Sequence, residues 1–573
     1  MVNYKEEIAK IIAGQVSELS EEDALELVEI PQDPAMGDYA FPCFRLAKLL
    51  RKAPQSIAAD IAQAIADRPL FEKVEQVNAY VNMFLSKEMY TRSTLEEAMD
   101  GENFGKTNVG DGKLVIVEYS SPNIAKPFHI GHIRSTVIGN SINLIYRALG
   151  YKVRRLNHVG DYGTQFGKMI VAYRHWGNEQ DVKDNPITTL LGYYTKFHVE
   201  AEKHPELDDE ARKAFADLEK GQEEEVKLWQ WFREESMKEF NRVYKMLDIE
   251  FDEVDGESFY SDKMQRFIDE LKEKGLLEES RGAQIVDLEA YGMPPALITK
   301  SDGSTLYCTR DIATAVYRKE TYDFYKNIYV VASQQNLYFQ QWMKVVELLG
   351  YDWVKDCIHV PFGMVSLEDG TMSTRAGRVV FLEDVLNKAV EKTREIIAEK
   401  NPDADESFVD DVAHQVGIGA VIFQELSNNK IKDYVFKWDK VLNFDGETGP
   451  YVQYTHARCA SVLRKAGEET TAKARNLDEV DFSYLNSDSA YALTRLLYAL
   501  PQTVVEAGEK FEPSIITRHI VNIAQAYNRF YHDEHILSEN EEERVAKVAL
   551  TIAAKNGIRN GLALLGMKAP ERM

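Results

Sequence analysis

Apolar residues change their spacing along the chain, and this divides it into regions of different predicted structure. In the first segment, residues 1–110, the run 46–51 has helical spacing, and the stretch 74–85 alternates apolar and polar positions. These patterns predict a mixed α+β domain with one strand over 74–85. The glycine-rich stretch 101–112 predicts the linker that ends this domain.

The second segment, residues 111–383, has the rhythm of a doubly wound α/β domain. Short β-branched runs alternate with helical patterns, as expected when helices cover both faces of a parallel sheet. Charged helical sequence interrupts this rhythm over 173–255 and predicts a helical insertion. The predicted strands are 114–117, 153–156, 328–331 and 358–365.

Beyond about residue 383 the apolar spacing is almost wholly helical. Residues 384–445 are predicted to form a helical stem, and residues 446–573 a separate all-α domain. The predicted fold class is therefore a doubly wound, Rossmann-like α/β domain with an α+β N-terminal domain and an all-α C-terminal bundle.

Length and charge narrow the class of protein. A chain of 573 residues exceeds one ordinary domain. Its formal net charge of -25 excludes a uniformly basic protein, although local clusters of Lys and Arg can still bind phosphate. The N-terminus has early acidic residues and lacks the apolar core of a signal peptide, and no apolar run approaches a membrane span. We therefore expect a cytoplasmic protein with no membrane partner.

The cysteines give no sign of a metal site or a disulfide framework. Cys43, Cys308, Cys357 and Cys459 lie far apart in sequence and lack the CxxC or Cys/His spacing of zinc ligands. We expect ordinary thiols and no structural metal.

The segment after the predicted strand 114–117 is the strongest candidate for chemistry. Pro127 suits the first turn of a helix, and His129 and His132 are three residues apart, so they share one helical face. A helix N-terminus attracts anions, and Gly131 leaves room for a flat base. The pattern indicates an ATP site. Taken alone, two histidines at this spacing are also compatible with a helix surface or a metal site.

The wider context resembles a known family. His129-Ile-Gly-His132 is similar to the first signature of class I aminoacyl-tRNA synthetases, and the blocks 118–126 and 157–167 resemble those of arginyl-tRNA synthetases. The resemblance covers nearly the whole chain. It implies that the N-terminal domain meets the corner of the tRNA and that the C-terminal domain binds the anticodon. It also implies activation of L-arginine with ATP and Mg2+, transfer to tRNA-Arg, a monomer, and activation that depends on bound tRNA.

The resemblance also assigns the phosphate-binding residues. The second class I signature normally supplies lysines, but the equivalent segment 371–377 has none. Lys126 is therefore expected to supply the missing cation, as in family members that lack the standard loop; its other reading is a solvated loop lysine. The residues expected to act in catalysis are His129, His132 and Lys126. Those expected to bind ATP are His129, Gly131, His132, Met364, Val365, Met372, Ser373 and Arg375.

Substrate choice is predicted to depend on Tyr307 and Asp311, which are four residues apart and share a helical face if a helix starts there. A phenol and a carboxylate can together receive a guanidinium. Asp311 could instead cap a helix or pair with Arg310. By resemblance, the arginine-binding residues are Glu118, Ser121, Asn123, His129, Tyr307, Asp311 and Gln335. Tyr338 stands where the family usually has a histidine.

Aromatic and cationic residues interleave in the helical C-terminal domain, a composition that suits unpaired bases. The residues expected to contact tRNA are Tyr80 and Asn82 in the N-terminal domain and Tyr454, Arg458, Tyr527 and Arg529 in the C-terminal domain. For each aromatic residue, a place in the core is the alternative. Two other functions stay open at this point: a different class I synthetase, and a catalytically silent tRNA-binding paralogue.

Overall fold

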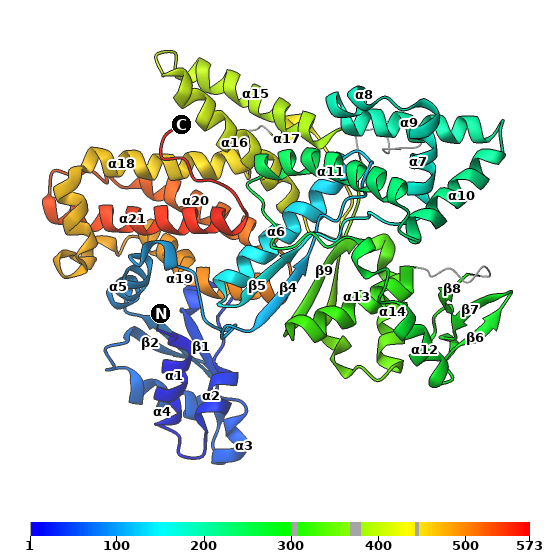
Figure 1. Cartoon of the computed structure of the whole chain (residues 1–573). Coiled ribbons are helices and arrows are strands. Elements are labelled where there is room, and N and C mark those ends of the chain that lie inside the picture. The colour runs from blue at the N-terminus through cyan, green and yellow to red at the C-terminus, as the bar shows by residue number, and fades with distance from the viewer. Residues whose placement is uncertain (1, 301–306, 367–379, 442–445) are drawn as a thin grey trace.

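The structure is a computed structural model that describes residues 2–300, 307–366, 380–441 and 446–573. Figure 1 shows an N-terminal domain in blue, a central sheet with helices around it, and a C-terminal bundle in orange and red. No helix in these ranges carries an apolar stretch long enough to cross a bilayer.

The N-terminal domain packs helices on a small antiparallel sheet of order β1-β3-β2. The sequence predicted one strand over 74–85, and this is wrong: two strands meet there in a hairpin, because Asn78 turns the chain with a left-handed φ of 55°. The strands are β1 (Tyr39–Pro42), β2 (Phe71–Val77) and β3 (Tyr80–Leu85); the helices are α1 (Tyr4–Ala13), α2 (Glu21–Leu27), α3 (Leu46–Leu50), α4 (Pro54–Ile65) and α5 (Lys87–Ala98).

The central sheet is entirely parallel, with the order β10-β9-β4-β5, and confirms the predicted fold class. Side chains of β4 alternate between its two faces: Val115 and Val117 pack in the core beside α6, whereas Ile116 packs in the core beside α13 and α14. The bounds are β4 (Leu114–Glu118), β5 (Lys152–Leu156), β9 (Lys326–Ala332), β10 (Cys357–Phe362), α6 (Ile133–Ala148), α13 (Tyr307–Tyr322) and α14 (Asn336–Leu348).

One predicted strand is divided in two. The sequence predicted a strand over 358–365, but β10 ends at Phe362, and β11 (Val365–Ser366) leaves the main sheet to pair with β12 (Tyr434–Val435). Gly363 lies between them against the backbone of Lys432 and Asp433, where a Cβ atom would come within 2.6 Å of the Lys432 carbonyl carbon. The chain can change direction here because glycine permits this close approach.

Two insertions extend from the sheet. In the region of the helical insertion predicted over 173–255, the structure has α7 (Thr164–Trp176), α8 (Glu179–Asp184), α9 (Pro186–Ala201), α10 (Glu206–Glu219) and α11 (Glu223–Met246). A second insertion, which the sequence did not reveal, holds α12 (Gln265–Glu273) and a small antiparallel sheet of β6 (Glu278–Ser280), β7 (Ala283–Val286) and β8 (Ala296–Thr299).

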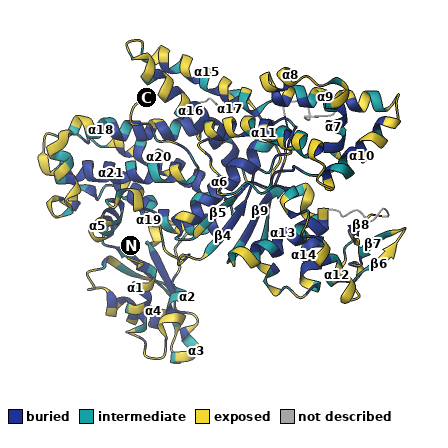
Figure 2. Cartoon of the chain, viewed as in Figure 1, coloured by how far each residue is buried: buried dark blue, intermediate teal, exposed yellow. Residues whose placement is uncertain are grey.

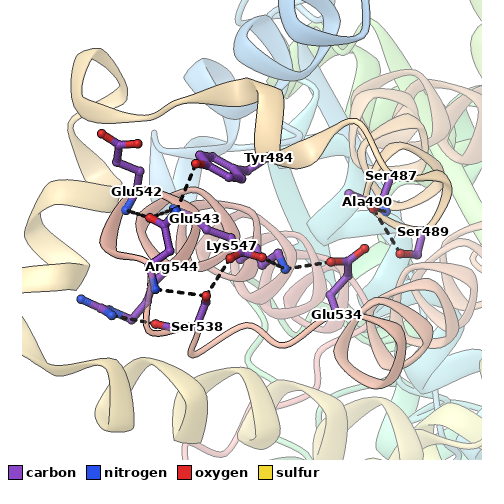
Figure 3. Close-up of polar contacts among 11 residues, drawn as sticks. Tyr484, Ser487, Ser489, Ala490, Glu534, Ser538, Glu542, Glu543, Arg544 and Lys547 are labelled. Atoms are coloured by element: carbon purple, nitrogen blue, oxygen red, sulfur yellow. Dashed lines mark hydrogen bonds and ion pairs between the residues drawn. The ribbon is translucent and has the colours of Figure 1, made fainter.

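The C-terminal part is helical, as predicted, and Figure 2 shows its buried residues in dark blue on the helices of the bundle. The Lys547 side chain is 4% exposed and forms ion pairs with Glu534 at 2.8 Å and Glu543 at 2.6 Å (Figure 3). These pairs stabilise the turn between the last two helices, α20 and α21. The helices are α15 (Leu382–Lys400), α16 (Glu406–Leu426), α17 (Trp438–Val441), α18 (Gly449–Arg475), α19 (Asp488–Glu509), α20 (Ser514–Asp533) and α21 (Glu541–Leu564).

Candidate active site

The segments that the sequence singled out meet at the carboxyl ends of the parallel strands. The turn 119–129 follows β4, residues 157–161 follow β5, residues 333–335 follow β9, and residues 363–365 follow β10. In open parallel sheets ligands bind at this edge. A bridge between Asn123 and Gly160 joins two of these turns directly.

The turn after β4 is held in a strained conformation. Ser120, Ser121 and Ala125 all have a left-handed φ, of 71°, 47° and 58°. Each such residue costs about 1–3 kcal/mol and persists only where its surroundings impose it. Here the Ser120 N–H donates to the Ser135 hydroxyl at 2.9 Å, and the Ala125 N–H donates to the Ser236 hydroxyl at 3.0 Å. The turn is therefore fixed from α6 and α11 before any ligand binds.

The helix that follows starts later than predicted. The sequence favoured a start at Pro127, but the chain stays extended through His129 (φ -101°, ψ 169°), which forms an antiparallel bridge with Phe381. A 3-10 turn, η3 (Ile130–His132), then leads into α6. Both histidines consequently lie at the helix entrance, where backbone N–H groups are free of intrahelical partners.

Backbone N–H groups fix the tautomer of both imidazoles. Gly131 N–H donates to Nδ1 of His129 at 3.0 Å, and His129 N–H donates to Nδ1 of His132 at 3.1 Å. A backbone N–H can only donate, so the proton of each neutral ring is assigned to Nε2, although Nδ1 of His132 also lies 3.3 Å from the carbonyl oxygen of His129. The ring centroids are 4.0 Å apart. Two neighbouring rings thus each carry an Nε2–H that can donate to an anion.

Burial keeps these rings neutral. It lowers the pKa of His132 to about 3, and the charges of His129 and Lys126 lower it further; burial also lowers the pKa of His129. Neutral imidazoles donate hydrogen bonds but supply no charge. A cation for phosphate must therefore come from another residue.

We expect acid to destabilise the fold through His132. The pKa of His132 is 6.5 in the unfolded chain and about 3 in the folded chain. Between these two values the unfolded chain binds more protons, so the free energy of unfolding decreases as the pH decreases. From pH 7 to pH 5 this one group costs about 2 kcal/mol. Thermal unfolding of wild type and His132→Gln at the two pH values measures it: the melting temperature of the variant should fall less. An equal fall in both proteins would contradict the expectation.

The other residues predicted to bind ATP are less fully placed. Met364 is 41% exposed, and Val365 is buried where β11 pairs with β12. Met372, Ser373 and Arg375 lie outside the described residues. These contacts remain predictions.

Tyr307 and Asp311 lie one turn apart at the start of α13, as the spacing predicted. Tyr307 is 58% exposed, whereas the Asp311 carboxylate is enclosed and accepts a hydrogen bond from the Tyr338 hydroxyl. Burial raises the pKa of Asp311 to about 6. The alternative pair with Arg310 does not form, because Arg310 pairs with Glu257 at 3.0 Å.

The buried charges around Asp311 lack one cation. Glu118 pairs with Arg318 at 2.5 Å, and Glu257 with Arg310, whereas Asp311 makes no ion pair with a Lys or Arg of the described ranges. A third guanidinium would complete this cluster. The internal partner of Glu118 argues against its predicted contact with a substrate guanidinium. Sequence reasoning missed Arg318, although its spacing of seven residues from Asp311 places both on one face of α13.

Three residues predicted to hold the polar end of the substrate lie at the same edge of the sheet. The Ser121 N–H donates to Asn157 Oδ1 at 3.2 Å, and its buried hydroxyl has no hydrogen-bond partner among the described residues. Asn123 is exposed beside Gly160, and Gln335 is exposed in the 3-10 turn after β9. Their contacts with a ligand stay predictions.

On the bundle, the Arg458 guanidinium packs near two exposed rings. Its carbon is 4.9 Å from the ring centroid of Tyr454 on α18 and 5.2 Å from that of Tyr531 on α20. Such a stack can be extended by an unpaired base. The sequence analysis predicted tRNA contacts for Tyr454 and Arg458, and these stay predictions; the structure adds Tyr531 beside them.

Tyr527 corrects a prediction, because its side chain is fully buried and no base can reach it. It lies on the face of α20 that carries Ile520 and Ile523 into the core. Arg529, on the outer face, pairs with Asp533 at 3.4 Å.

The two predicted tRNA contacts of the N-terminal domain differ in access. Tyr80 is partly exposed and packs edge-on against Phe44, with 5.5 Å between ring centroids. Asn82 is 4% exposed, and its amide faces the sulfur of Met36. A base could reach Asn82 only if the segment around Met36 moved.

Within the residues that the structure describes, no three or more His, Cys, Asp or Glu side chains are arranged to hold a metal ion. All four cysteines are buried and free.

Three family models match successive parts of the chain. The class I tRNA synthetase (R) catalytic domain matches residues 94–438, the DALR anticodon binding domain matches 452–573, and the arginyl tRNA synthetase N-terminal domain matches 4–85.

Full-length relatives agree with these matches. The chain is 58% identical to arginine–tRNA ligase of Clostridioides difficile and 56% identical to that of Halothermothrix orenii, over all of both chains in each case. Among solved structures, Thermus thermophilus arginyl-tRNA synthetase has a TM-score of 0.79 at 25% identity, covering 100% of this chain and 99% of its own. Arginyl-tRNA synthetase of Plasmodium falciparum gives the same TM-score and identity with full coverage of both. The chain belongs to the arginyl-tRNA synthetase family.

Proposed function

We propose that this protein joins L-arginine to tRNA-Arg in two steps. First, the arginine carboxylate attacks the α-phosphorus of ATP; a bond between them forms, the bond to the β-phosphate oxygen breaks, and arginyl-adenylate and pyrophosphate result. A hydroxyl of the terminal adenosine of tRNA then attacks the arginyl carbonyl and releases AMP. Mg2+ enters with the ATP substrate. The observation that carries the substrate assignment is the partly buried Asp311 carboxylate, which makes no ion pair with a Lys or Arg of the described residues.

The substrate guanidinium is the cation that this carboxylate lacks. Its planar donors match a carboxylate in a two-bond geometry, and the exposed Tyr307 lies one turn away on the same helix. Neutral citrulline would leave Asp311 without a counter-charge, and a lysine ammonium would lack the fork geometry. Ser121, Asn123 and Gln335 are then within the region of the α-amino and carboxylate groups.

The phosphates lie at the entrance of α6. Nε2–H groups of His129 and His132 donate to phosphate oxygens that gain charge in the transition state, and this costs no reorganisation because the backbone already orients both rings. Lys126 precedes them by a few residues and supplies the positive charge. Its proximity is evident in its contribution to the low pKa of His132, after the larger effects of burial and His129.

Pyrophosphate exchange tests the proposal. Each amino acid is supplied in turn with ATP, with and without total tRNA. Exchange should depend on arginine and, by family resemblance, on tRNA. Exchange with lysine or glutamine would overturn the substrate assignment, and its absence with every amino acid would favour the silent paralogue. Size measurement in solution tests the expected monomer, and cell fractionation tests the cytoplasmic location.

For the tRNA, the stack of Tyr454, Arg458 and Tyr531 is the proposed anticodon contact. We expect Arg458→Ala to raise the KM for tRNA-Arg about 10-fold, because base stacking on such platforms is worth about 1–3 kcal/mol. The KM values for ATP and arginine should not change. Aminoacylation at varied tRNA concentration measures this. Lys510→Ala at the end of α19, which removes only an exposed ion pair with Glu506, serves as the comparison; equal effects of both substitutions would show that bulk charge alone matters.

A further inference from the structure

Arg134 lies two residues after His132 in the first turn of α6, and its side chain is fully buried. Nη1 donates to two backbone carbonyls, that of Gly363 at 2.9 Å and that of Lys432 at 2.7 Å. Gly363 directly precedes Met364 and β11; Lys432 stands shortly before β12. One guanidinium nitrogen therefore connects α6 to the segments that lead into β11 and β12.

The rest of the side chain is equally enclosed. Nε lies 3.6 Å from Oε2 of Glu425 on α16, which is also fully buried, and the guanidinium faces the ring of Tyr434 at 5.3 Å. A buried cation is costly unless charge and hydrogen bonds compensate it. Glu425 is the acidic group nearest to Nε, and burial raises its pKa to about 8. Among the described residues only Nη1 of Arg134 makes hydrogen bonds, so the two carbonyls fix the position of the side chain.

The backbone segments to which Arg134 donates are held in place by further contacts. The missing side chain of Gly363 lets it approach the Lys432 and Asp433 backbone, and the Met364 N–H donates to Asp433 Oδ1 at 2.6 Å. The position of Met364 relative to α6 is thus set by a short chain of contacts: α6 through Arg134 to the Gly363 and Lys432 carbonyls, and from Asp433 to Met364.

We propose that Arg134 is a positioning residue for the ATP site: it sets the spacing between the His129–His132 turn, which holds the phosphates, and the Met364–Val365 segment, which holds the adenine. This inference rests on the proposed ATP roles of those residues. It assigns no contact between Arg134 and ATP. It accounts for arginine in place of lysine at this position, because both carbonyl bonds come from Nη1, which lies one bond farther along the side chain than a lysine ammonium.

Arg134→Lys is the decisive variant. It keeps a positive charge opposite Glu425 but loses the two hydrogen bonds from Nη1 to the carbonyls of Gly363 and Lys432. Displacement of a site by about 1 Å costs on the order of 100-fold in rate. We therefore expect the KM for ATP in arginine-dependent pyrophosphate exchange to rise at least about 10-fold, with the KM for arginine within about 2-fold of wild type. Glu425→Gln leaves both hydrogen bonds from Arg134 to the carbonyls in place. It should lower the melting temperature and change the KM for ATP much less than Arg134→Lys does.

Lys547→Met is the matched control, because it removes a buried, ion-paired cation far along the chain in the bundle (Figure 3). At saturating tRNA it should lower the melting temperature without changing the KM for ATP. The inference is overturned if Arg134→Lys raises the KM for ATP and arginine equally, or changes neither in a folded protein. A wild type without arginine-dependent exchange would instead refute the proposed function, so the two failures are distinct.

Discussion

Asp311→Asn is expected to reduce kcat/KM for arginine by about 10,000-fold, because a site built to pair a substrate charge discriminates by this order when the pairing is lost. The substitution keeps the size of the side chain and removes the charge that the buried cluster leaves for the substrate. Most of the loss should appear at the arginine-dependent step, while the KM for ATP stays near wild type. Pyrophosphate exchange at varied arginine and ATP concentrations separates the two.

Two controls distinguish charge from packing. Tyr338→Phe removes the hydroxyl that donates to Asp311 but keeps the carboxylate, so it should cost less than about 10-fold, the size of one ordinary hydrogen bond. Citrulline should compete better with arginine in Asp311→Asn than in wild type. If Asp311→Asn and Tyr338→Phe lower arginine use equally, the carboxylate is not the guanidinium acceptor.

The arginine KM should also depend on pH in a defined direction. Burial raises the pKa of Asp311 to about 6 in the empty site. The carboxylate protonates as pH falls through this value, so the KM should rise about 10-fold per pH unit below pH 6 and be flat above it. Asp311→Asn removes this titration. A profile of the same shape in the variant would assign it to another group.

The fold was predictable wherever apolar spacing alone determines structure. Val115 and Val117 belong to one core and Ile116 to another, so the run reads as a strand buried on both faces. Spacing failed where a single residue changes the course of the chain. Asn78 turns one predicted strand into a hairpin, and Gly363 divides another, because a left-handed turn and a close backbone approach leave little trace in the apolar pattern.

The sequence predicted which residues form the site much better than it predicted which of them contact one another. The spacing of His129 and His132 placed two imidazoles together, but their tautomers depend on which backbone N–H each ring faces. The charge pairing of Glu118 with Arg318 joins residues 200 positions apart, and only the parallel sheet brings them together. Tyr527 and Tyr531 show the same limit: both occur in one aromatic run, and burial against neighbouring helices decides which of them a base can reach.

The phosphate site raises a question of charge. ATP brings several negative charges, both histidines are neutral because burial lowers their pKa values, and the second signature segment has no lysine. Lys126 is the cation that the same strained turn carries toward the helix entrance. If it compensates for the missing lysines, its contribution should grow as negative charge moves onto the phosphates during the reaction.

Lys126→Ala should therefore slow arginyl-adenylate formation by about 100- to 1,000-fold, the range seen when one preorganised group that stabilises transition-state charge is removed. The effect should fall on kcat, with the KM for arginine nearly unchanged, and rapid-quench measurement of adenylate in a single turnover detects it directly. Lys126→Arg keeps the charge but changes its geometry, so it should recover only part of the rate. An unchanged rate in Lys126→Ala would show that another cation neutralises the phosphates, and Arg375→Ala, in the segment of the second signature, would then be the variant that loses activity.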